Sequence, residues 1–378
     1  MRRNNGIFPT LVFLILAVLI CVIASLTVSA SETPKLSARA ATLYEPKSGR
    51  FLYSHNEDTR LAMASTTKIM TALVAAQKLS PDETVIIPKE AVGTEGSSAY
   101  LTEGEELTVK ELLYALLLRS ANDASVSLAI HTSGSVESFA LLMNEKADAL
   151  GLKDTNFTNP HGLPDEEHFT SAHDLAIIAA EALKDPLISE ICATQKAVIT
   201  SNTSTRTFLN HNKLLHLYDG CVGVKTGFTK AAGRCLVGAA LRDGVTLISV
   251  TLNAPDDWND HKRLFDLGFE LTESRLLARR GEYSYSLPVI GADGAAAVKA
   301  ELSSDVRAVL LKTDKAPAAD VRLSRYFTAP IEAGQKLGEV IFTLDGKVIA
   351  RGELTAKESV PKAKKKGFLA KIKDFFKK

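Results

Sequence analysis

The sequence has few cysteines, a single tryptophan and almost no net charge. Of its 378 residues four are Cys and one is Trp, and 45 basic side chains against 44 acidic ones give a formal net charge of +1 at pH 7. Neither a Cys-x-x-Cys nor a His-x-x-x-His spacing occurs, so the sequence offers no ligand pattern for a metal centre. The charge balance also argues against a nucleic-acid enzyme, which needs a strongly basic working face.

Residues 1–30 are predicted to be an export signal rather than part of the fold. Arg2 and Arg3 precede an apolar stretch from Ile7 to Ala24, and the small residues of Val28-Ser29-Ala30 offer a cleavage site. An uncleaved membrane anchor is the alternative, because the stretch is nearly long enough to span a bilayer. In both cases the bulk of the protein is exported.

Three cysteines remain after export, namely Cys192, Cys221 and Cys235. This number is odd and sparse, so no disulfide framework is expected. A Cys221–Cys235 pair across a hairpin stays open, but three buried thiols are the favoured interpretation.

The remaining 350 or so residues are too many for one ordinary core, so two domains are predicted. In the first, residues 36–275, strands are expected at 40–43, 51–53, 222–228, 235–241 and 246–252. Helical patterns lie between the early and the late strands, which predicts an α/β (α+β) domain with an antiparallel sheet flanked by helices. Residues 281–358 alternate short apolar runs with Gly, Asp and Pro turns, and a small β-sandwich is expected there.

The most informative stretch is Ala64-Ser65-Thr66-Thr67-Lys68, which opens an apolar helix that ends before Pro81. Residues i and i+3 share one helical face, so the Ser65 hydroxyl and the Lys68 amine are within reach of each other. Burial, the positive helix end and a second cation would each lower the Lys68 pKa, and a neutral lysine can activate a serine. By itself Ser-x-x-Lys is a short pattern, and an N-cap beside a surface lysine is the ordinary alternative.

Two further short motifs make the Ser-x-x-Lys pattern more specific. Ser120-Ala121-Asn122 follows a helix that begins with the capping box of Thr108 and Glu111, and its side chains can face a cleft. Lys225-Thr226-Gly227 lies in a predicted strand, where a glycine marks close approach by another backbone or a ligand. Each piece alone could be an ordinary loop or edge strand. The three together, in this order, are far more specific.

The combination resembles the penicillin-recognising serine enzymes, and the surrounding residues are similar to the serine D-alanyl-D-alanine carboxypeptidases, the low-molecular-mass penicillin-binding proteins. The similarity runs from about Ala40 to Gly268. It rests on four stretches: Met63-Ala64-Ser65-Thr66-Thr67-Lys68-Ile69-Met70-Thr71-Ala72-Leu73, Ser120-Ala121-Asn122-Asp123-Ala124, Asn159-Pro160-His161-Gly162-Leu163-Pro164 and Val224-Lys225-Thr226-Gly227-Phe228-Thr229.

The resemblance implies a β-lactamase/transpeptidase-like fold and an acyl-enzyme reaction without metal or organic cofactor. It makes Ser65 the acylated nucleophile and Lys68 its general base. Ser120 is expected to relay a proton toward the departing D-alanine, and Asn122 to hold both the substrate peptide and Lys68. The substrate would be a peptidoglycan stem peptide that ends in D-Ala-D-Ala, and β-lactam antibiotics would acylate the same serine.

The remaining expected site residues belong to the strand. Lys225 would attract the terminal carboxylate and help to keep Lys68 neutral, and Thr226 would hydrogen-bond that carboxylate. Gly227 would let the substrate pair along the strand edge. The backbone N–H groups of Ser65 and Phe228 are expected to form the oxyanion hole, with no role for the Phe228 side chain.

Three alternatives stay open. A β-lactamase of class A needs a glutamate that activates the deacylating water, whereas the stretch between Asn122 and Lys225 shows Pro160-His161-Gly162-Leu163-Pro164 in place of Glu-x-x-Leu-Asn. We interpret His161 as a residue that orders this loop. A D,D-endopeptidase uses the same site. A non-catalytic penicillin-binding sensor is disfavoured by the complete motifs.

The near-neutral total charge hides a basic C-terminus. Residues 362–378 hold eight lysines and one aspartate, or +7, so the rest of the chain carries −6 (+1 minus +7). Apolar residues of this segment fall at i, i+1, i+4, i+7 and i+8, on one face of a helix: Phe368, Leu369, Ile372, Phe375 and Phe376. We predict an amphipathic helix that anchors the enzyme peripherally to the outer face of the cytoplasmic membrane through its anionic surface. A disordered basic terminus is the alternative.

Overall fold

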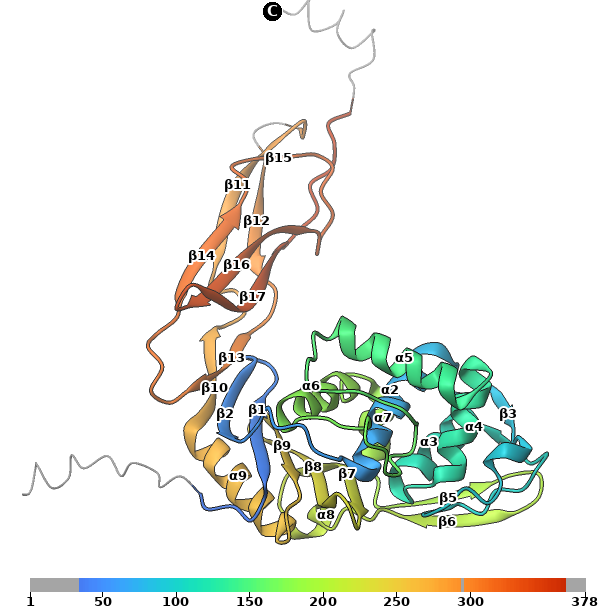
Figure 1. Ribbon diagram of the computed structural model, residues 1–378. Coiled ribbons are helices and arrows are strands. Elements are labelled where there is room, and N and C mark those ends of the chain that lie inside the picture. The colour runs from blue at the N-terminus through green and yellow to red at the C-terminus, as the bar shows by residue number, and fades with distance from the viewer. Residues whose placement is uncertain (1–33, 294–295, 365–378) are drawn as a thin grey trace, which may run out of the picture. The chain divides into compact units, whose positions relative to one another are not determined.

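The computed structural model describes residues 34–293 and 296–364 (Figure 1). Its central feature is a five-stranded sheet in the order β2-β1-β9-β8-β7, in which every neighbouring pair is antiparallel. The strands are β1 (Ala40–Glu45), β2 (Arg50–His55), β7 (Cys221–Thr229), β8 (Gly233–Arg242) and β9 (Val245–Leu252). The predicted antiparallel sheet is confirmed, and β7 forms one of its edges.

The turn between β8 and β9 shows why these residues form a hairpin. Asp243 and Gly244 both have positive φ, 48° and 80°, as a two-residue hairpin turn requires. The two strands that this turn joins are buried on both faces, because Val237 and Val250 belong to one apolar cluster while Leu236 and Leu247 belong to another. Helices therefore cover the sheet on both sides.

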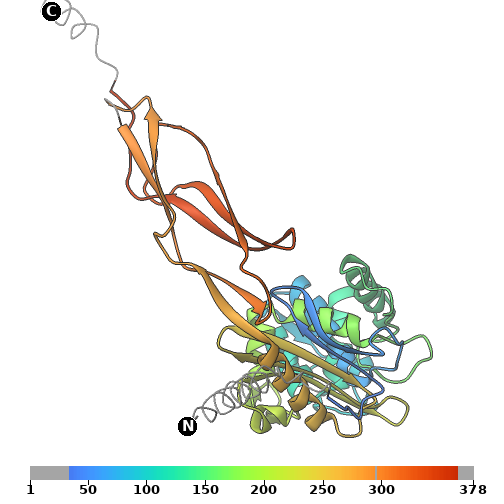
Figure 2. The same cartoon turned by 90° about the vertical axis from the view of Figure 1, so that its left-hand side faces the viewer.

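On one side lies α9 (Asp257–Leu271), which packs against β8 and β9 through Leu264 and Phe265. Figure 2 views the molecule from the side on which α9 lies in Figure 1. The other face is covered by α6 (Ala172–Ala182), which contacts β1 and β9. The Ser171 side chain caps α6 by accepting a hydrogen bond from the Asp174 backbone N–H at 3.1 Å.

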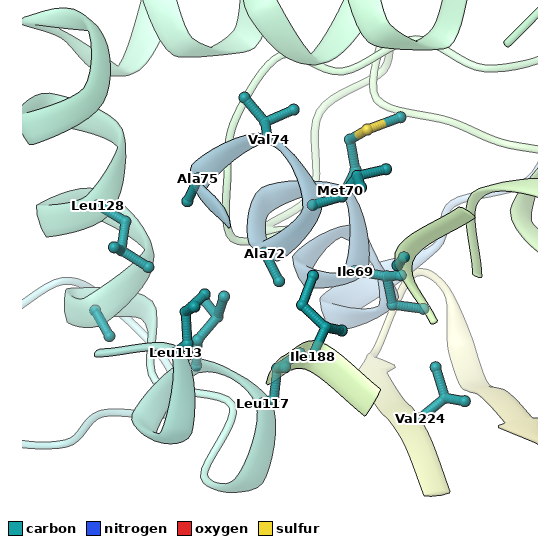
Figure 3. Packing of buried hydrophobic residues seen from close by; sticks show 14 of the residues in the cluster. Ile69, Met70, Ala72, Val74, Ala75, Leu113, Leu117, Leu128, Ile188 and Val224 are labelled. Atoms are coloured by element: carbon teal, nitrogen blue, oxygen red, sulfur yellow. The ribbon is translucent and has the colours of Figure 1, made fainter. Parts of the chain in front are cut away.

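The large helical region is built around α2 (Lys68–Lys78), whose first eight residues are all buried. Figure 3 shows Ile69, Met70 and Ala72 of α2 among side chains from neighbouring helices. The surrounding helices are α3 (Val109–Leu118), α4 (Asn122–Ser133), α5 (Val136–Ala149) and α7 (Pro186–Ala193). The predicted capping box of Thr108 and Glu111 is present at the start of α3. This apolar packing holds the start of α2 in place.

Several short elements were not expected from the sequence. They are the 3₁₀ helices η1 (Ala64–Thr67) and η2 (Lys89–Ala91), helix α8 (Leu214–Leu217), and the paired strands β3 (Thr84–Ile86) with β4 (Glu106–Thr108) and β5 (Lys196–Thr200) with β6 (Thr205–Leu209). Helix α7 was also not predicted from the sequence, because a proline usually indicates the end of a helix. Pro186 is instead the first residue of α7, where its missing N–H costs nothing, and Asp185 caps the helix.

The C-terminal part is all β, as predicted. A two-stranded sheet pairs β10 (Thr272–Ala278) with β13 (Val306–Leu311), and a six-stranded sheet has the order β14-β16-β17-β12-β11-β15. Its strands are β11 (Ser284–Ile290), β12 (Ala296–Leu302), β14 (Ala318–Leu323), β15 (Phe327–Thr328), β16 (Lys336–Leu344) and β17 (Lys347–Ala356). One of the Asp- and Gly-containing turns, Asp345-Gly346, joins β16 to β17 in a hairpin.

Cysteine burial differs in part from the expectation. All three described cysteines are free; Cys192 and Cys235 are buried, but Cys221 is only half-buried because it begins the edge strand β7.

The expected export signal and most of the expected basic helix lie outside the described residues. Within the described ranges no single helix has the length and apolar character of a membrane span, although α4 and α5, bent by 83° at their junction, pass that test as a pair.

Candidate active site

Ser65 and Lys68 lie at the start of the buried helix α2. Ser65 belongs to the 3₁₀ turn η1, and Lys68 is the first residue of α2. The Lys68 Nζ atom is 3.1 Å from Ser65 Oγ, so the predicted contact is present. Lys68 Nζ also donates to Asn122 Oδ1 and to the His161 carbonyl oxygen, each at 2.6 Å. The amine therefore has two fixed acceptors and one remaining direction, toward the serine.

Burial controls the charge of Lys68. Its side chain has no exposed surface, and this desolvation lowers the pKa of Lys68 well below 10.5. The positive charge of Lys225 lowers the pKa further, while Asp123 acts in the opposite direction. Lys225 is itself buried, which lowers its pKa to about 7. Two buried cations close together favour loss of one proton, and the Lys225 charge acts in this sense on Lys68.

Ser120 and Asn122 come from the turn between α3 and α4. Ser120 has a φ of 64°, in the left-handed region that serine rarely occupies, and its Oγ is buried without a hydrogen-bond partner among the described residues. Asn122 begins α4, and its Nδ2 donates to the Glu95 carbonyl oxygen while Oδ1 accepts from Lys68. An unpaired buried hydroxyl held by strained backbone is a feature of functional sites.

The strand residues Lys225, Thr226, Gly227 and Phe228 lie on the edge strand β7, beside η1. At Gly227 an added Cβ would lie 3.1 Å from the Ser65 backbone nitrogen, so glycine permits the close approach of the strand to the serine. The Phe228 side chain is 65% exposed, as expected for a residue whose side chain is not used. Lys225 Nζ donates to the Thr226 carbonyl oxygen at 2.8 Å.

A cavity of about 370 Å³ lies where these elements meet. Five of the eight expected residues line it, and these are Ser65, Ser120, Thr226, Gly227 and Phe228. The other three, Lys68, Asn122 and Lys225, lie buried behind them and do not line the cavity. The structure thus gathers all eight residues, five in the wall of the cavity and three buried behind it.

Comparison with family models decides the identity of the fold. A model described as D-alanyl-D-alanine carboxypeptidase matches residues 27–256, which is more than half of the chain. The chain belongs to this family. A second model, the C-terminal domain of penicillin-binding protein 5, matches residues 273–362.

Individual members of this carboxypeptidase family are similar to the chain over most of its length. The chain is 36% identical over 348 residues to the D-alanyl-D-alanine carboxypeptidase DacF of Bacillus subtilis, covering 89% of this chain and 88% of DacF. It is 32% identical over 370 residues to DacC of Escherichia coli, covering 91% and 88%. Among solved structures, penicillin binding protein 5 from Haemophilus influenzae matches with a TM-score of 0.63 and 32% identity, covering 87% of this chain and 99% of that chain.

Six further residues line the cavity that were not predicted from the sequence of this carboxypeptidase: Ser97, His211, Lys213, Arg234, Asp257 and Trp258. Arg234 Nη2 donates to Asp257 Oδ1 at 2.8 Å, and the guanidinium lies 5.5 Å from the Trp258 ring centroid. Arg234 Nε is buried without a partner among the described residues. The sequence held one signal that could have identified Arg234 as a cavity residue. Pairing of the two predicted strands places Arg234 directly opposite Phe228.

The loop at His161 contacts the catalytic region through its backbone. The His161 carbonyl oxygen accepts from Lys68, and the Nδ1 atom accepts from the Leu163 backbone N–H at 3.2 Å. Burial, and then the Lys68 charge, lowers the pKa of His161 to about 3, so the ring is neutral. These contacts agree with the loop-ordering role expected for His161.

Gly162 in this loop gives a first prediction. Its φ is 86°, and an added Cβ would lie 2.0 Å from the Ala64 carbonyl oxygen, one residue before Ser65. We expect Gly162→Ala to lower the free energy of unfolding by more than the roughly 1–3 kcal/mol of backbone strain alone and to slow acylation of Ser65. Chemical denaturation and the rate of labelling by a fluorescent penicillin measure both effects.

Gly104→Ala is the matched control, because Gly104 has a similar φ of 77° but nothing within 4 Å of the added Cβ. Gly104→Ala should lose stability only through backbone strain, because its added Cβ does not clash with any neighbouring atom. Equal losses of stability in the two variants would contradict the proposed contact between the loop and Ala64.

Proposed function

We propose that this chain is a serine D-Ala-D-Ala carboxypeptidase that removes the terminal D-alanine from peptidoglycan stem peptides through an acyl-enzyme on Ser65. The observation that carries the proposal is the buried Lys68 amine, 3.1 Å from Ser65 Oγ, whose pKa is lowered by burial and by Lys225. The family of the chain supports the same activity.

The hydrogen bonds of Lys68 favour its action as a general base. Asn122 Oδ1 and the His161 carbonyl oxygen accept hydrogen bonds only, so they hold two N–H groups of a neutral amine. The lone pair then faces Ser65, whose O–H donates to it. Attack of Ser65 Oγ on the scissile carbonyl passes the hydroxyl proton to Lys68.

The developing oxyanion needs two donors near Ser65 Oγ. The backbone N–H groups of Ser65 and Phe228 come from η1 and from the edge strand β7, and Gly227 lets these two elements approach each other. Preorganised backbone donors stabilise the charge of the tetrahedral intermediate without reorganisation. The substrate backbone extends along the free edge of β7.

The departing D-alanine needs a proton on its amine and a site for its carboxylate. Ser120 Oγ is buried and unpartnered within the described part of the chain, so it is free to pass a proton to the leaving nitrogen. Thr226 donates to the carboxylate from the wall of the cavity, and the buried Lys225 supplies positive charge behind it. Water then hydrolyses the ester on Ser65. A β-lactam forms the same ester by ring opening.

The direct test uses the wild-type protein with two reagents. Mass spectrometry after incubation with penicillin should place one adduct on the peptide that contains Ser65, and diacetyl-L-Lys-D-Ala-D-Ala should release free D-alanine. Diacetyl-L-Lys-D-Ala-L-Ala is the matched control. An adduct without D-alanine release would favour a sensor or an endopeptidase, and rapid turnover of penicillin would favour a β-lactamase. Neither adduct nor release would refute the proposal.

The two buried lysines predict a bell-shaped pH dependence of kcat/KM. Lys68 must be neutral, so the rate rises as the pH increases through its lowered pKa. Lys225 must be charged to attract the carboxylate, so the rate falls above its pKa of about 7. In Lys225→Arg the guanidinium stays charged, and the alkaline limb should move to higher pH. An unchanged alkaline limb in a folded Lys225→Arg protein would contradict this assignment.

For localisation we propose an exported enzyme that is tethered to the outer face of the cytoplasmic membrane by the basic segment 362–378. Each lysine near an anionic surface contributes roughly 1 kcal/mol, and the segment has eight lysines. Protein that begins at Ser31 should therefore sediment with phosphatidylglycerol vesicles but not with phosphatidylcholine vesicles. Truncation after Ser359 should abolish sedimentation and leave D-alanine release intact. Equal sedimentation of the truncated protein would rule out the tether.

A further inference from the structure

A second cavity, of about 500 Å³, adjoins the active-site cavity. We name it the Arg119 pocket, after a residue in its wall; Tyr100, Arg206, Leu209 and His211 also line it. His211 lines both cavities, so the two are neighbours that share one wall. The volume of the Arg119 pocket exceeds the space that the methyl group of a terminal D-alanine requires.

The position of the pocket relates it to the leaving group. Arg119 directly precedes Ser120, which faces the leaving nitrogen in the proposed reaction. The shared residue His211 lines the active-site cavity together with Thr226, which is proposed to hold the terminal carboxylate. The Lys225 charge also acts on the pKa of His211, after the larger effect of burial. The pocket therefore adjoins the active-site cavity at His211 and at the residue next to Ser120.

The charges in the pocket are not balanced. Arg206 is neutralised by the buried carboxylate of Glu105, with Nη2 and Oε2 2.9 Å apart. Arg119 has no acidic partner among the described residues, and its Nη1 donates to His211 Nε2 at 3.3 Å. An imidazole nitrogen that accepts from a guanidinium belongs to a neutral ring, and burial lowers the pKa of His211 in the same sense. No Asp or Glu of the described chain lines this pocket, which leaves one uncompensated positive charge.

The other walls suit a short hydrocarbon chain. Phe208 is buried, and the exposed fractions of Tyr100 and Leu209 are 75% and 60%, so large apolar surfaces border the opening. Methylene groups can pack there while a terminal carboxylate reaches the Arg119 guanidinium. Guanidinium–carboxylate contacts are among the strongest charge-assisted hydrogen bonds in proteins.

We propose that the Arg119 pocket binds the side chain of the leaving residue and selects D-residues whose side chain ends in a carboxylate. This inference rests on the proposed carboxypeptidase function. It widens the substrate class from a terminal D-alanine to an acidic terminal D-residue, with D-glutamate as the simplest case. The α-carboxylate keeps its place at Thr226, and the side-chain carboxylate occupies the new subsite.

The chemistry at the reacting centre is unchanged. Ser65 Oγ forms an ester with the penultimate D-alanine carbonyl carbon, the amide C–N bond breaks, and the leaving amine takes a proton. Water then hydrolyses the ester, which returns free Ser65 and a shortened peptide. The only new interaction is between the departing residue and Arg119.

The test compares three peptides: diacetyl-L-Lys-D-Ala followed by D-Ala, D-Glu or D-Gln. D-Gln has nearly the shape of D-Glu but no charge, so the D-Glu/D-Gln ratio of kcat/KM isolates the charge effect. We expect a ratio of about tenfold or more in the wild-type protein, corresponding to at least ~1.4 kcal/mol. Arg119→Gln should bring the ratio close to one. Lys78→Gln is the charge-matched control, because Lys78 is exposed at the far end of α2, and it should keep the wild-type ratio.

The outcomes separate this inference from the proposed function. Equal cleavage of the D-Glu and D-Gln peptides by the wild-type protein overturns the subsite, as does a ratio that persists in Arg119→Gln. Should that variant not fold, the wild-type ratio must fall as salt is raised, because Arg119 is only half-buried and salt screens its charge; an unaltered ratio overturns the subsite as well. Absence of D-alanine release from the D-Ala peptide refutes the proposed function itself.

Discussion

Ser65→Ala should abolish both covalent labelling by penicillin and release of D-alanine. The variant loses the only atom that forms the acyl-enzyme, so kcat/KM is expected to fall by at least about 10⁴-fold. Its fold should persist, because Ser65 makes few side-chain contacts besides the 3.1 Å approach to Lys68 Nζ. Intact-protein mass spectrometry measures the adduct, and a D-amino-acid oxidase assay measures release.

Ser97→Ala is the control for this result. Ser97 lines the same cavity, but it is exposed and makes no hydrogen bond to Lys68 within the described part of the chain. Its loss should change kcat/KM by less than about tenfold, the scale of one lost solvent-exposed hydrogen bond. A penicillin adduct that persists in Ser65→Ala would place the nucleophile elsewhere.

Lys68→Arg should be nearly as damaging as Ser65→Ala, although it keeps a long basic side chain at this position. A guanidinium does not lose its proton in proteins, so it cannot accept the Ser65 proton at any accessible pH. General-base catalysis typically contributes 10²–10⁴-fold, and we expect acylation to slow by about that factor or more. The second-order rate of penicillin labelling, measured by stopped flow, gives the effect on acylation alone.

A second variant separates proton transfer from charge. Lys68→Met keeps an unbranched side chain as far as Cε and removes the amine, so a purely electrostatic role predicts that Lys68→Arg is far more active than Lys68→Met. A general-base role predicts that both are inactive. Lys78→Met, at the other end of α2, should label at the wild-type rate because Lys78 is exposed. Near-normal labelling of Lys68→Arg would exclude the base.

Local rules in the sequence predicted much of the framework. The strand patterns at 235–241 and 246–252 located β8 and β9, and the capping box of Thr108 and Glu111 located the start of α3. These features depend on residues close together in the chain, so no knowledge of the fold was needed. Pro186 shows the limit of such rules, since the same residue can end one helix or begin the next, and only packing and the Asp185 cap decide.

The sequence by itself pointed to the side chains that we propose carry the chemistry, because the three motifs are specific as a set and their order is unusual. Tertiary structure alone decided how those side chains behave. The Lys68 pKa is lowered by burial and by Lys225, a residue far along the chain, and neither effect exists in an isolated helix. Arg234 and Asp257 reach the cavity from β8 and the start of α9, and Arg119 meets His211 from separate loops. Desolvation and charge proximity are properties of three-dimensional packing, and for that reason no local pattern revealed them.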